Sequence, residues 1–312
     1  MKQALTALAL ACAVAVYAAP PEEIDVQGMY EGTWKDGGKE GKLEARVVAL
    51  GSQEYQVFAV RHLGGGKTEK VELRGKTNGD TVSFEGAGWQ GVYADGTIEG
   101  AKLALKRTVP ESPTIGRKPP EGAIVLLDGK HFERMERGRQ KDGSQSEWEI
   151  GDDGSVLIPK RGMRSRVSVE GSYDLHVEFL VPFRPDKRGQ GRGNSGVYLP
   201  CRTEIQVLDS FGMTTYRGGG CGGLYRWKDP DTFDKFNLSS YPPLVWQTYD
   251  VEYRVRTDGG RAAGFLTVLH NGVKIHDNVK LKRQPRKGGF SFQDHGNPVR
   301  YRNIWVKPIK ED

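Results

Sequence analysis

The sequence of 312 residues is 28% charged and 37% hydrophobic, which excludes a bundle of membrane-spanning helices and a disordered chain and leaves room for one or two globular domains. Forty-two glycines without a Gly-X-Y period indicate many turns and favour an all-β chain. Lys and Arg exceed Asp and Glu by 46 to 40, but they are scattered and do not alternate with aromatic residues, so we expect no nucleic-acid partner.

Residues 1–19 are typical of a secretory signal peptide. Lys2 precedes an apolar run that ends in small residues before Pro20. This pattern predicts an exported protein, periplasmic or extracellular, with lipid attachment at Cys12 as the alternative. No later segment approaches the ~20 apolar residues of a spanning helix, so we expect no transmembrane segment.

Residues 24–107 alternate short β-like runs with turn dipeptides, which predicts a small antiparallel β domain of unassigned role. Its expected strands are residues 43–50, 55–60, 70–73, 81–84 and 97–105. Residues 108–121 follow with four prolines, Pro110, Pro113, Pro119 and Pro120. Such a stretch predicts a semi-rigid linker between two domains.

Residues 122–308 contain about ten further strand candidates and no long amphipathic helix, which predicts two stacked antiparallel sheets. Asn271-Gly272 between two apolar runs is the sharpest hairpin pattern, because both residues tolerate positive φ. The expected strands are residues 124–127, 148–150, 155–158, 173–181, 195–199, 204–208, 247–256, 264–270, 273–276, 290–293 and 301–306.

One predicted strand presents a polar face that could hold a ligand. A period of two places Ile205 and Val207 on one face and Glu204 and Gln206 on the other. A bulge near the end of this strand would add Asp209 to the polar row. The alternative is a half-exposed strand with solvated carboxylates.

A second polar strand has the same alternation. Phe290 and Phe292 share one face, while Gln293 and His295 share the other, just before a turn that contains Gly296 and Pro298. Two such strands could line one cleft. His295 is therefore a candidate functional residue, although a structural role is the alternative.

Two further groups of residues are candidates for ligand contact. Arg192 and Asn194 lie on a Gly-rich turn without the context of a phosphate loop, and we interpret them as donors to ligand oxygens. Residues 212–245 form a long aromatic loop whose Tyr225 and Trp227 rings could pack on sugar faces. Its aspartates at 229, 231 and 234 lack the spacing of a calcium loop, so no metal and no cofactor are expected.

Cys201 and Cys221 are the two cysteines that remain after the signal segment. An oxidising compartment would permit one disulfide between them, and two separate buried thiols are equally compatible with the sequence.

Six blocks in order together resemble the 3-keto-disaccharide hydrolase domain family: GNSGVYL from 193, EIQVLDS from 204, CGGLY from 221, WQTYD from 246, VLHNGV from 268 and QDHGNPV from 293. The resemblance covers residues 122–308. It implies a concanavalin-like jelly-roll sandwich similar to that of laminarinase-type glucanases, and it says nothing of the first domain.

The family resemblance implies a carbohydrate substrate, namely glycosides whose C3 hydroxyl is already oxidised to a ketone. Such a ketone acidifies the C2 hydrogen, so that a base can start an elimination that expels the C1 oxygen before water adds. Glu204 or His295 would be the base and the other the acid, with Arg192 and Asn194 as donors to the oxyanion. The residues left to hold sugar hydroxyls are Gln206, Asp209, Tyr225 and Gln293.

Two other functions fit the same sequence. A glucan hydrolase would use Glu204 and Asp209 as its carboxylate pair. A non-catalytic carbohydrate-binding module would bind sugars through Trp227 and Tyr225.

Overall fold

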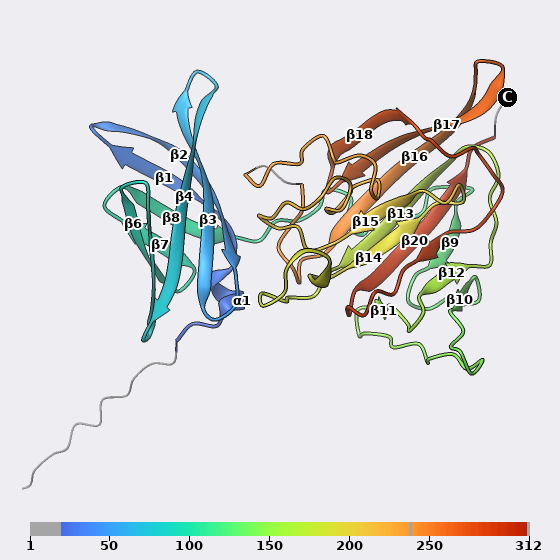
Figure 1. The fold of residues 1–312 in the computed structure, drawn as a ribbon, viewed down its shortest axis with the longest axis horizontal. Coiled ribbons are helices and arrows are strands. Elements are labelled where there is room, and N and C mark those ends of the chain that lie inside the picture. Colours follow the sequence, from blue (N-terminus) through green and yellow to red (C-terminus); the bar gives the residue numbers. More distant parts are fainter. Residues whose placement is uncertain (1–19, 237–238, 311–312) are drawn as a thin grey trace, which may run out of the picture.

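The computed structural model describes residues 20–236 and 239–310 and contains two β domains (Figure 1). The predicted signal segment, with Cys12, lies outside the described residues. Within the part of the chain that is described, no helix is long and apolar enough to cross a membrane.

The first domain is a closed antiparallel barrel of eight strands, drawn at the left of Figure 1. Each strand pairs with the next in sequence, and β8 pairs with β1 to close the barrel. The one-turn helix α1 (Glu23–Val26) precedes the barrel. The strands are β1 (Gly28–Asp36), β2 (Lys39–Ala49), β3 (Glu54–Gly64), β4 (Lys67–Asn78), β5 (Thr81–Gly86), β6 (Trp89–Ala94), β7 (Thr97–Gly100) and β8 (Leu103–Thr108).

Large side chains fill the interior of the barrel. Trp34, Tyr55 and Phe84 are at most 2% exposed, and the space left among the interior side chains is only about 10 Å³. Eight strands enclose just enough room for side chains, so a filled interior is the ordinary outcome. The barrel therefore has no internal cavity for a ligand such as a sugar.

The second domain is a sandwich of two antiparallel sheets, as the sequence predicted. The five-stranded sheet has the order β10-β12-β19-β14-β15, with β10 (Met135–Arg137), β12 (Met163–Ser165), β19 (Ser291–Phe292), β14 (Ser195–Tyr198) and β15 (Glu204–Val207). The seven-stranded sheet has the order β11-β20-β13-β16-β17-β18, with β9 beside β20. These strands are β9 (Ile124–Leu127), β11 (Val156–Leu157), β13 (Tyr173–Leu180), β16 (Gln247–Asp258), β17 (Arg261–His270), β18 (Val273–Lys280) and β20 (Arg300–Pro308).

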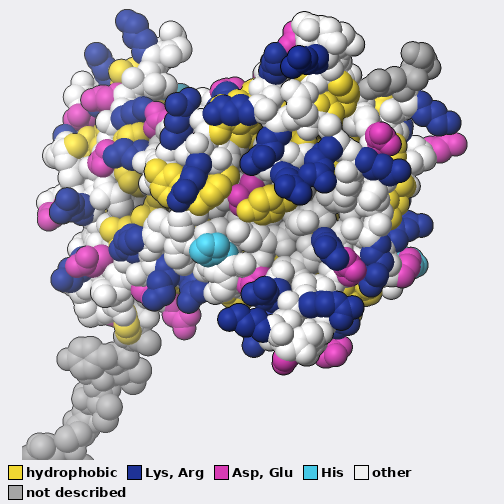
Figure 2. Space-filling model, turned by 45° about the vertical axis from the view of Figure 1, so that its right-hand side comes forward, with side chains coloured by type: hydrophobic (Ala, Val, Ile, Leu, Met, Phe, Trp, Pro, Cys, Tyr) yellow, Lys and Arg dark blue, Asp and Glu magenta, His cyan; other side chains and the backbone are white. Residues whose placement is uncertain are grey.

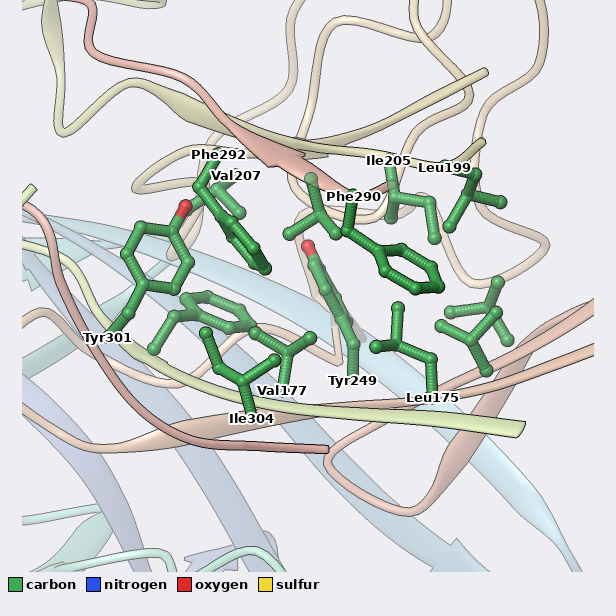
Figure 3. Close-up of a cluster of buried hydrophobic side chains, with 14 of the residues drawn as sticks. Leu175, Val177, Leu199, Ile205, Val207, Tyr249, Phe290, Phe292, Tyr301 and Ile304 are labelled. Atoms are coloured by element: carbon green, nitrogen blue, oxygen red, sulfur yellow. The ribbon is translucent and has the colours of Figure 1, made fainter. Parts of the chain in front are cut away.

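The core lies between these two sheets. In Figure 3 the side chains of Ile205, Val207 and Phe292 point down from the five-stranded sheet onto Val177 and Tyr249 of the seven-stranded sheet. All five are at most 1% exposed. The period-two alternation in β15 and β19 therefore sorts apolar side chains inward and leaves polar ones on the outer face.

The β17–β18 hairpin turns at the predicted dipeptide. Asn271 and Gly272 have φ of 52° and 78°, and they connect His270 directly to Val273. Two consecutive positive φ values define the type I′ turn, whose twist matches the flanking strands. The hairpin prediction is confirmed.

The Pro-rich segment lies against the sandwich instead of standing apart as a spacer. Thr114 donates a 2.6 Å hydrogen bond to Asp250, and the backbone amide of Gly116 donates one of 2.6 Å to Glu178. Burial alone would raise the pKa of Glu178, but hydrogen bonds from His176, Asn303 and Arg302 lower it to about 2. The segment thus covers a buried polar network on the seven-stranded sheet.

The barrel and the sandwich share a small apolar cluster. Phe58 of β3 contacts Phe236 edge to face with ring centroids 5.4 Å apart, and Val48 and Phe211 complete the buried cluster. Around it, Lys235 forms a 2.5 Å ion pair with Glu72. These contacts join residues far apart in sequence, so the two domains pack against each other.

Two fully buried histidines make the sandwich sensitive to acid. His276 Nε2 donates a 2.7 Å hydrogen bond to the Gly222 carbonyl, and burial lowers the pKa of His276 to about 4 and that of His270 to about 3. In the unfolded chain these two histidines gain protons near pH 6.5, whereas in the folded chain they stay neutral at that pH. Stability therefore falls as the pH drops below about 6.5, by up to about 1.4 kcal/mol per pH unit for each histidine.

We predict that His276→Gln, which retains a donor for Gly222, loses less stability than the wild type between about pH 7 and about pH 5. Urea unfolding at each pH measures the difference. His131→Gln is the control, because His131 is exposed and a hydrogen bond to Asp128 raises its pKa. Equal pH slopes for His276→Gln and the wild type would contradict the assignment.

Candidate active site

A straight row of polar side chains crosses the outer face of the five-stranded sheet. Antiparallel register pairs Glu204 of β15 with Tyr198 of β14, and Tyr198 with Ser291 of β19. The same row continues through Arg164 of β12 to Glu136 of β10. Because residues paired across strands point to the same face, the five side chains line one surface.

Glu204 occupies the end of this row and is only 7% exposed. Its carboxyl group lies over the Cα of Gly196, where a Cβ atom would overlap Oε1 and would lie 3.0 Å from Cδ. Glycine at position 196 of β14 therefore leaves the space that the carboxylate occupies.

A short chain of neutral hydrogen-bonding groups leads to this carboxylate. Tyr198 hydrogen-bonds to Glu204, and Gln293 Nε2 donates a 3.4 Å hydrogen bond to the Tyr198 hydroxyl. Burial raises the pKa of Glu204 above its usual range, while the Tyr198 hydrogen bond and the charge of His295 lower it in part. Desolvation is therefore the dominant influence, and it makes Glu204 a stronger base than an exposed glutamate.

His295 lies close enough for its charge to influence Glu204, as the hypothesis of one shared site requires. The ring is exposed, and its backbone carbonyl accepts a 3.1 Å hydrogen bond from the Asn297 side chain. His295 is thus fixed through its backbone while its imidazole is accessible from solvent. The sequence analysis predicted that Glu204, Gln293 and His295 line one cleft, and in the structure the three residues lie near one another on the five-stranded sheet.

Two tyrosines border the site beyond β15. The backbone amide of Tyr225 donates a 3.2 Å hydrogen bond to the Glu204 carbonyl, and Tyr225 is 36% exposed. The Tyr216 hydroxyl donates to that of Tyr225 at 3.1 Å, and burial together with this bond raises the pKa of Tyr216 to about 12. Tyr225 therefore stands where a sugar ring next to Glu204 could pack.

The comparisons with known proteins agree with this architecture. The family model for the 3-keto-alpha-glucoside-1,2-lyase-like domain matches residues 122–307. The chain belongs to this family. The family resemblance seen in the sequence is therefore confirmed for the second domain.

Two solved structures are similar to this chain, and both are described as a "putative glycosyl hydrolase" from Parabacteroides distasonis. The first is 27% identical, with a TM-score of 0.51 over 61% of this chain and 85% of that chain. The second is 17% identical, with a TM-score of 0.43 over 61% and 95%. No curated protein matches the chain. A carbohydrate-active enzyme of the glycosyl hydrolase type is the function class that the family and the first neighbour support.

In this lyase-like domain, Asn194 and Gln206 form a buried amide cluster beside the site. Gln206 Nε2 donates to Asn194 Oδ1 at 3.0 Å and to Gln190 Oε1 at 3.1 Å, while Asn194 Nδ2 donates to Gln190 at 3.0 Å. Both are at most 2% exposed. They hold the loop before β14 in place, and a bound sugar could not reach them without moving that loop.

Arg192 and Asp209 are not placed as the sequence analysis expected. Arg192 Nε donates a 2.6 Å hydrogen bond to Asp209 Oδ2, and both side chains are completely buried. The guanidinium also reaches the carbonyl of Ala49 and the side chain of Gln27, both from the barrel. The bulge that would have turned Asp209 toward Glu204 does not form, because Asp209 pairs with Arg192 at the domain contact.

The remaining candidates have protein partners. Trp227 is half-buried against the core with the Lys282 ammonium 4.9 Å from its ring centroid. The three aspartates of the loop bind the Gly218 amide, Lys228 and Lys70 respectively. Cys201 and Cys221 are separate buried thiols, which decides between the two alternatives left by the sequence.

Sequence reasoning did not single out Tyr198. Its position could nonetheless be predicted from the sequence, because alternation along residues 195–199 places Tyr198 on the same face as Gly196, opposite the buried Val197.

If the Arg192–Asp209 pair holds the domains together, Arg192→Met should lower the free energy of unfolding by about 3–5 kcal/mol, because a buried carboxylate is left unpaired. The double variant Arg192→Met/Asp209→Leu should lose less than the sum of the single losses. Urea unfolding of all four proteins measures this coupling. Wild-type stability with weakened glycoside binding in Arg192→Met would instead restore the ligand role predicted from the sequence.

The space above Gly196 gives a direct test of the carboxylate position. Gly196→Ala introduces a Cβ where the Glu204 carboxyl lies, so we expect turnover to fall by about tenfold or more while the fold is retained. Gly191→Ala is the matched control, since the nearest atom to its Cβ would be 3.8 Å away. Steady-state kinetics and circular dichroism provide the measurements, and unchanged kinetics in Gly196→Ala would contradict the placement.

Proposed function

We propose that the protein is an exported enzyme that cleaves the glycosidic bond of 3-keto-glycosides by elimination and hydration. The observation that carries the proposal is a desolvated carboxylate, Glu204, that is hydrogen-bonded by Tyr198 on the outer face of the sheet. Family membership and this geometry support the same chemistry.

In the first step Glu204 removes the C2 proton of the sugar. The C–H electrons form the C2–C3 double bond, and the C3 carbonyl oxygen takes up the negative charge as an enolate. A carboxylate with a raised pKa suits this step, because proton abstraction improves as the pKa of the base approaches the working pH.

In the second step the enolate re-forms the C3 carbonyl and a C1–C2 double bond, and the C1–O bond breaks with its electron pair on the departing oxygen. His295, whose ring is exposed beside the site, supplies the proton that makes this oxygen a neutral alcohol. Tyr198 and Gln293, which are hydrogen-bonded to each other beside Glu204, would contact the sugar oxygens.

In the third step water adds to the enone. Its oxygen bonds to C1, and one of its protons passes to His295 to replace the proton that the departing oxygen received. Glu204, whose acquired proton exchanges with solvent, then protonates C2, so that the products are the free 3-keto sugar and the alcohol. Water is the one co-reactant, and the base is regenerated.

The rival functions have less support. Glycosidases of the two-carboxylate type need a second carboxyl group facing the first across the bond. Asp209, the candidate partner of Glu204, instead forms a buried ion pair with Arg192. A binding module that used Trp227 as a platform would need the ring free, whereas it packs on the core under Lys282.

The purified protein incubated with 3-keto-trehalose, beside trehalose, tests the proposal. We expect release of 3-keto-glucose from the oxidised sugar alone, and a decrease of roughly 10²–10⁴-fold in kcat for Glu204→Gln and His295→Ala. Glu252→Gln and His131→Ala change exposed residues of the same domain and are the matched controls. Cleavage of trehalose at a similar rate, or full activity in both site variants, would refute the proposal.

The same assay run in D₂O separates elimination from direct hydrolysis. Elimination and hydration place deuterium on C2 of the released sugar, whereas direct hydrolysis retains the original hydrogen there. Mass spectrometry reads the label, and 3-keto-glucose incubated without enzyme corrects for spontaneous exchange. An unlabelled C2 in the enzymatic product would exclude the C2 abstraction step.

A further inference from the structure

A long groove runs from the candidate active site across the outer face of the five-stranded sheet. It has a volume of about 1340 Å³ and begins at Tyr198 and Gln293. Seven arginines and two carboxylates border it, which gives it a strongly positive balance. In Figure 2, where the second domain is turned forward, Lys and Arg side chains gather on the visible face. The arginines of the groove are Arg137, Arg139, Arg161, Arg164, Arg166, Arg202 and Arg286.

Most of this charge is not neutralised by the protein. Arg164 and Arg166 share Glu136, and Arg137 pairs with Glu147. Among the described residues no carboxylate lies within ion-pair distance of the other four, Arg139, Arg161, Arg202 and Arg286. A concave surface with several free guanidinium groups attracts anions strongly.

Two of the free arginines occupy backbone positions that disfavour any side chain. Arg161 and Arg202 have φ of 70° and 62°, at the tight turns that precede β12 and β15. Glycine adopts this left-handed conformation without the steric cost that a residue with a Cβ incurs. Both turns therefore place a guanidinium group at the edge of the groove in a backbone conformation that glycine would adopt with less strain.

The groove is aligned with the row of polar side chains that ends at Glu204. The register that pairs Glu204 with Tyr198 and Ser291 continues to Arg164, so a chain of sugars lying across the strands with one ring at Glu204 would pass over the arginines. Planar guanidinium groups match carboxylates and sulfates with two parallel hydrogen bonds.

We propose that the groove binds the anionic part of an oligosaccharide, a uronate or sulfated sugar attached to the ring that is cleaved. This inference rests on the proposed function for the position of the cleaved ring, whereas anion binding itself does not depend on turnover. A saccharide fits better than a nucleic acid, because the accessible lining offers Tyr198 and no series of exposed aromatic rings for bases to stack on.

Isothermal titration calorimetry with three tetrasaccharides tests the proposal: tetragalacturonate, a heparin tetrasaccharide and uncharged maltotetraose. We expect both anionic probes to bind at low salt, with affinity that falls as NaCl is raised, and maltotetraose to bind at least about tenfold more weakly. The stronger of the two anionic probes identifies carboxylate or sulfate as the preferred group.

The double variant Arg161→Gly/Arg202→Gly should bind the anionic probes about tenfold or more weakly, with a Tm equal to or above that of the wild type because the strain is relieved. Arg256→Ser/Arg261→Ser removes the same charge from exposed positions on the β16–β17 hairpin, which borders no part of the groove, and should leave binding unchanged.

The outcomes separate this inference from the proposed function. Anion binding without turnover of any 3-keto-glycoside refutes the proposed function and leaves the groove assignment standing. Turnover without preference for the anionic probes, equal losses in both double variants, or tighter binding of a single-stranded oligonucleotide than of either saccharide would overturn the groove assignment.

Discussion

The register of β14 between its two neighbours determines what the second domain can do. β14 has four residues, and its alternation sends Val197 into the core while Gly196 and Tyr198 face outward. The backbone hydrogen bonds of β14 thereby determine both which side chains enter the core and where the Glu204 carboxylate lies. A shift of one residue would bury Tyr198 and expose Val197, so stability and site geometry depend on the same hydrogen bonds.

The barrel is part of the framework of the site. The Arg192 guanidinium donates hydrogen bonds to Asp209 and to carbonyl and amide oxygens of the barrel, while the Arg192 backbone carbonyl accepts a 2.9 Å hydrogen bond from the Asp209 amide. Gln190, two residues earlier, binds the Asn194–Gln206 cluster under the active-site face. The domain contact and the loop beside the carboxylate are therefore connected through a few buried polar groups, which tolerate little displacement.

The sequence predicted the parts of the molecule that depend on local alternation. The faces of β15 and β19, the Asn271-Gly272 hairpin and the grouping of Glu204, Gln293 and His295 followed from a period of two and from turn chemistry. Strands β1 and β6 were not predicted, since glycines interrupt their apolar alternation. The partner of Arg192 could not be predicted, because an arginine on a Gly-rich turn looks the same whether a ligand or another domain accepts its hydrogen bonds.

The distribution of charge along the polar row is consistent with one substrate that spans it. Glu204 on β15 and Arg164 on β12 are separated by three strand spacings, roughly 14 Å at about 4.8 Å each. An anionic group placed at Glu204 would be repelled by the carboxylate that takes the proton in the proposed mechanism. Held at the arginines instead, it would anchor the saccharide at a distance from the base, and the reacting ring would meet Glu204, neutral hydrogen-bonding groups and one imidazole. Binding energy from the remote charge could then position the C2 hydrogen without raising the cost of charge formation at C3.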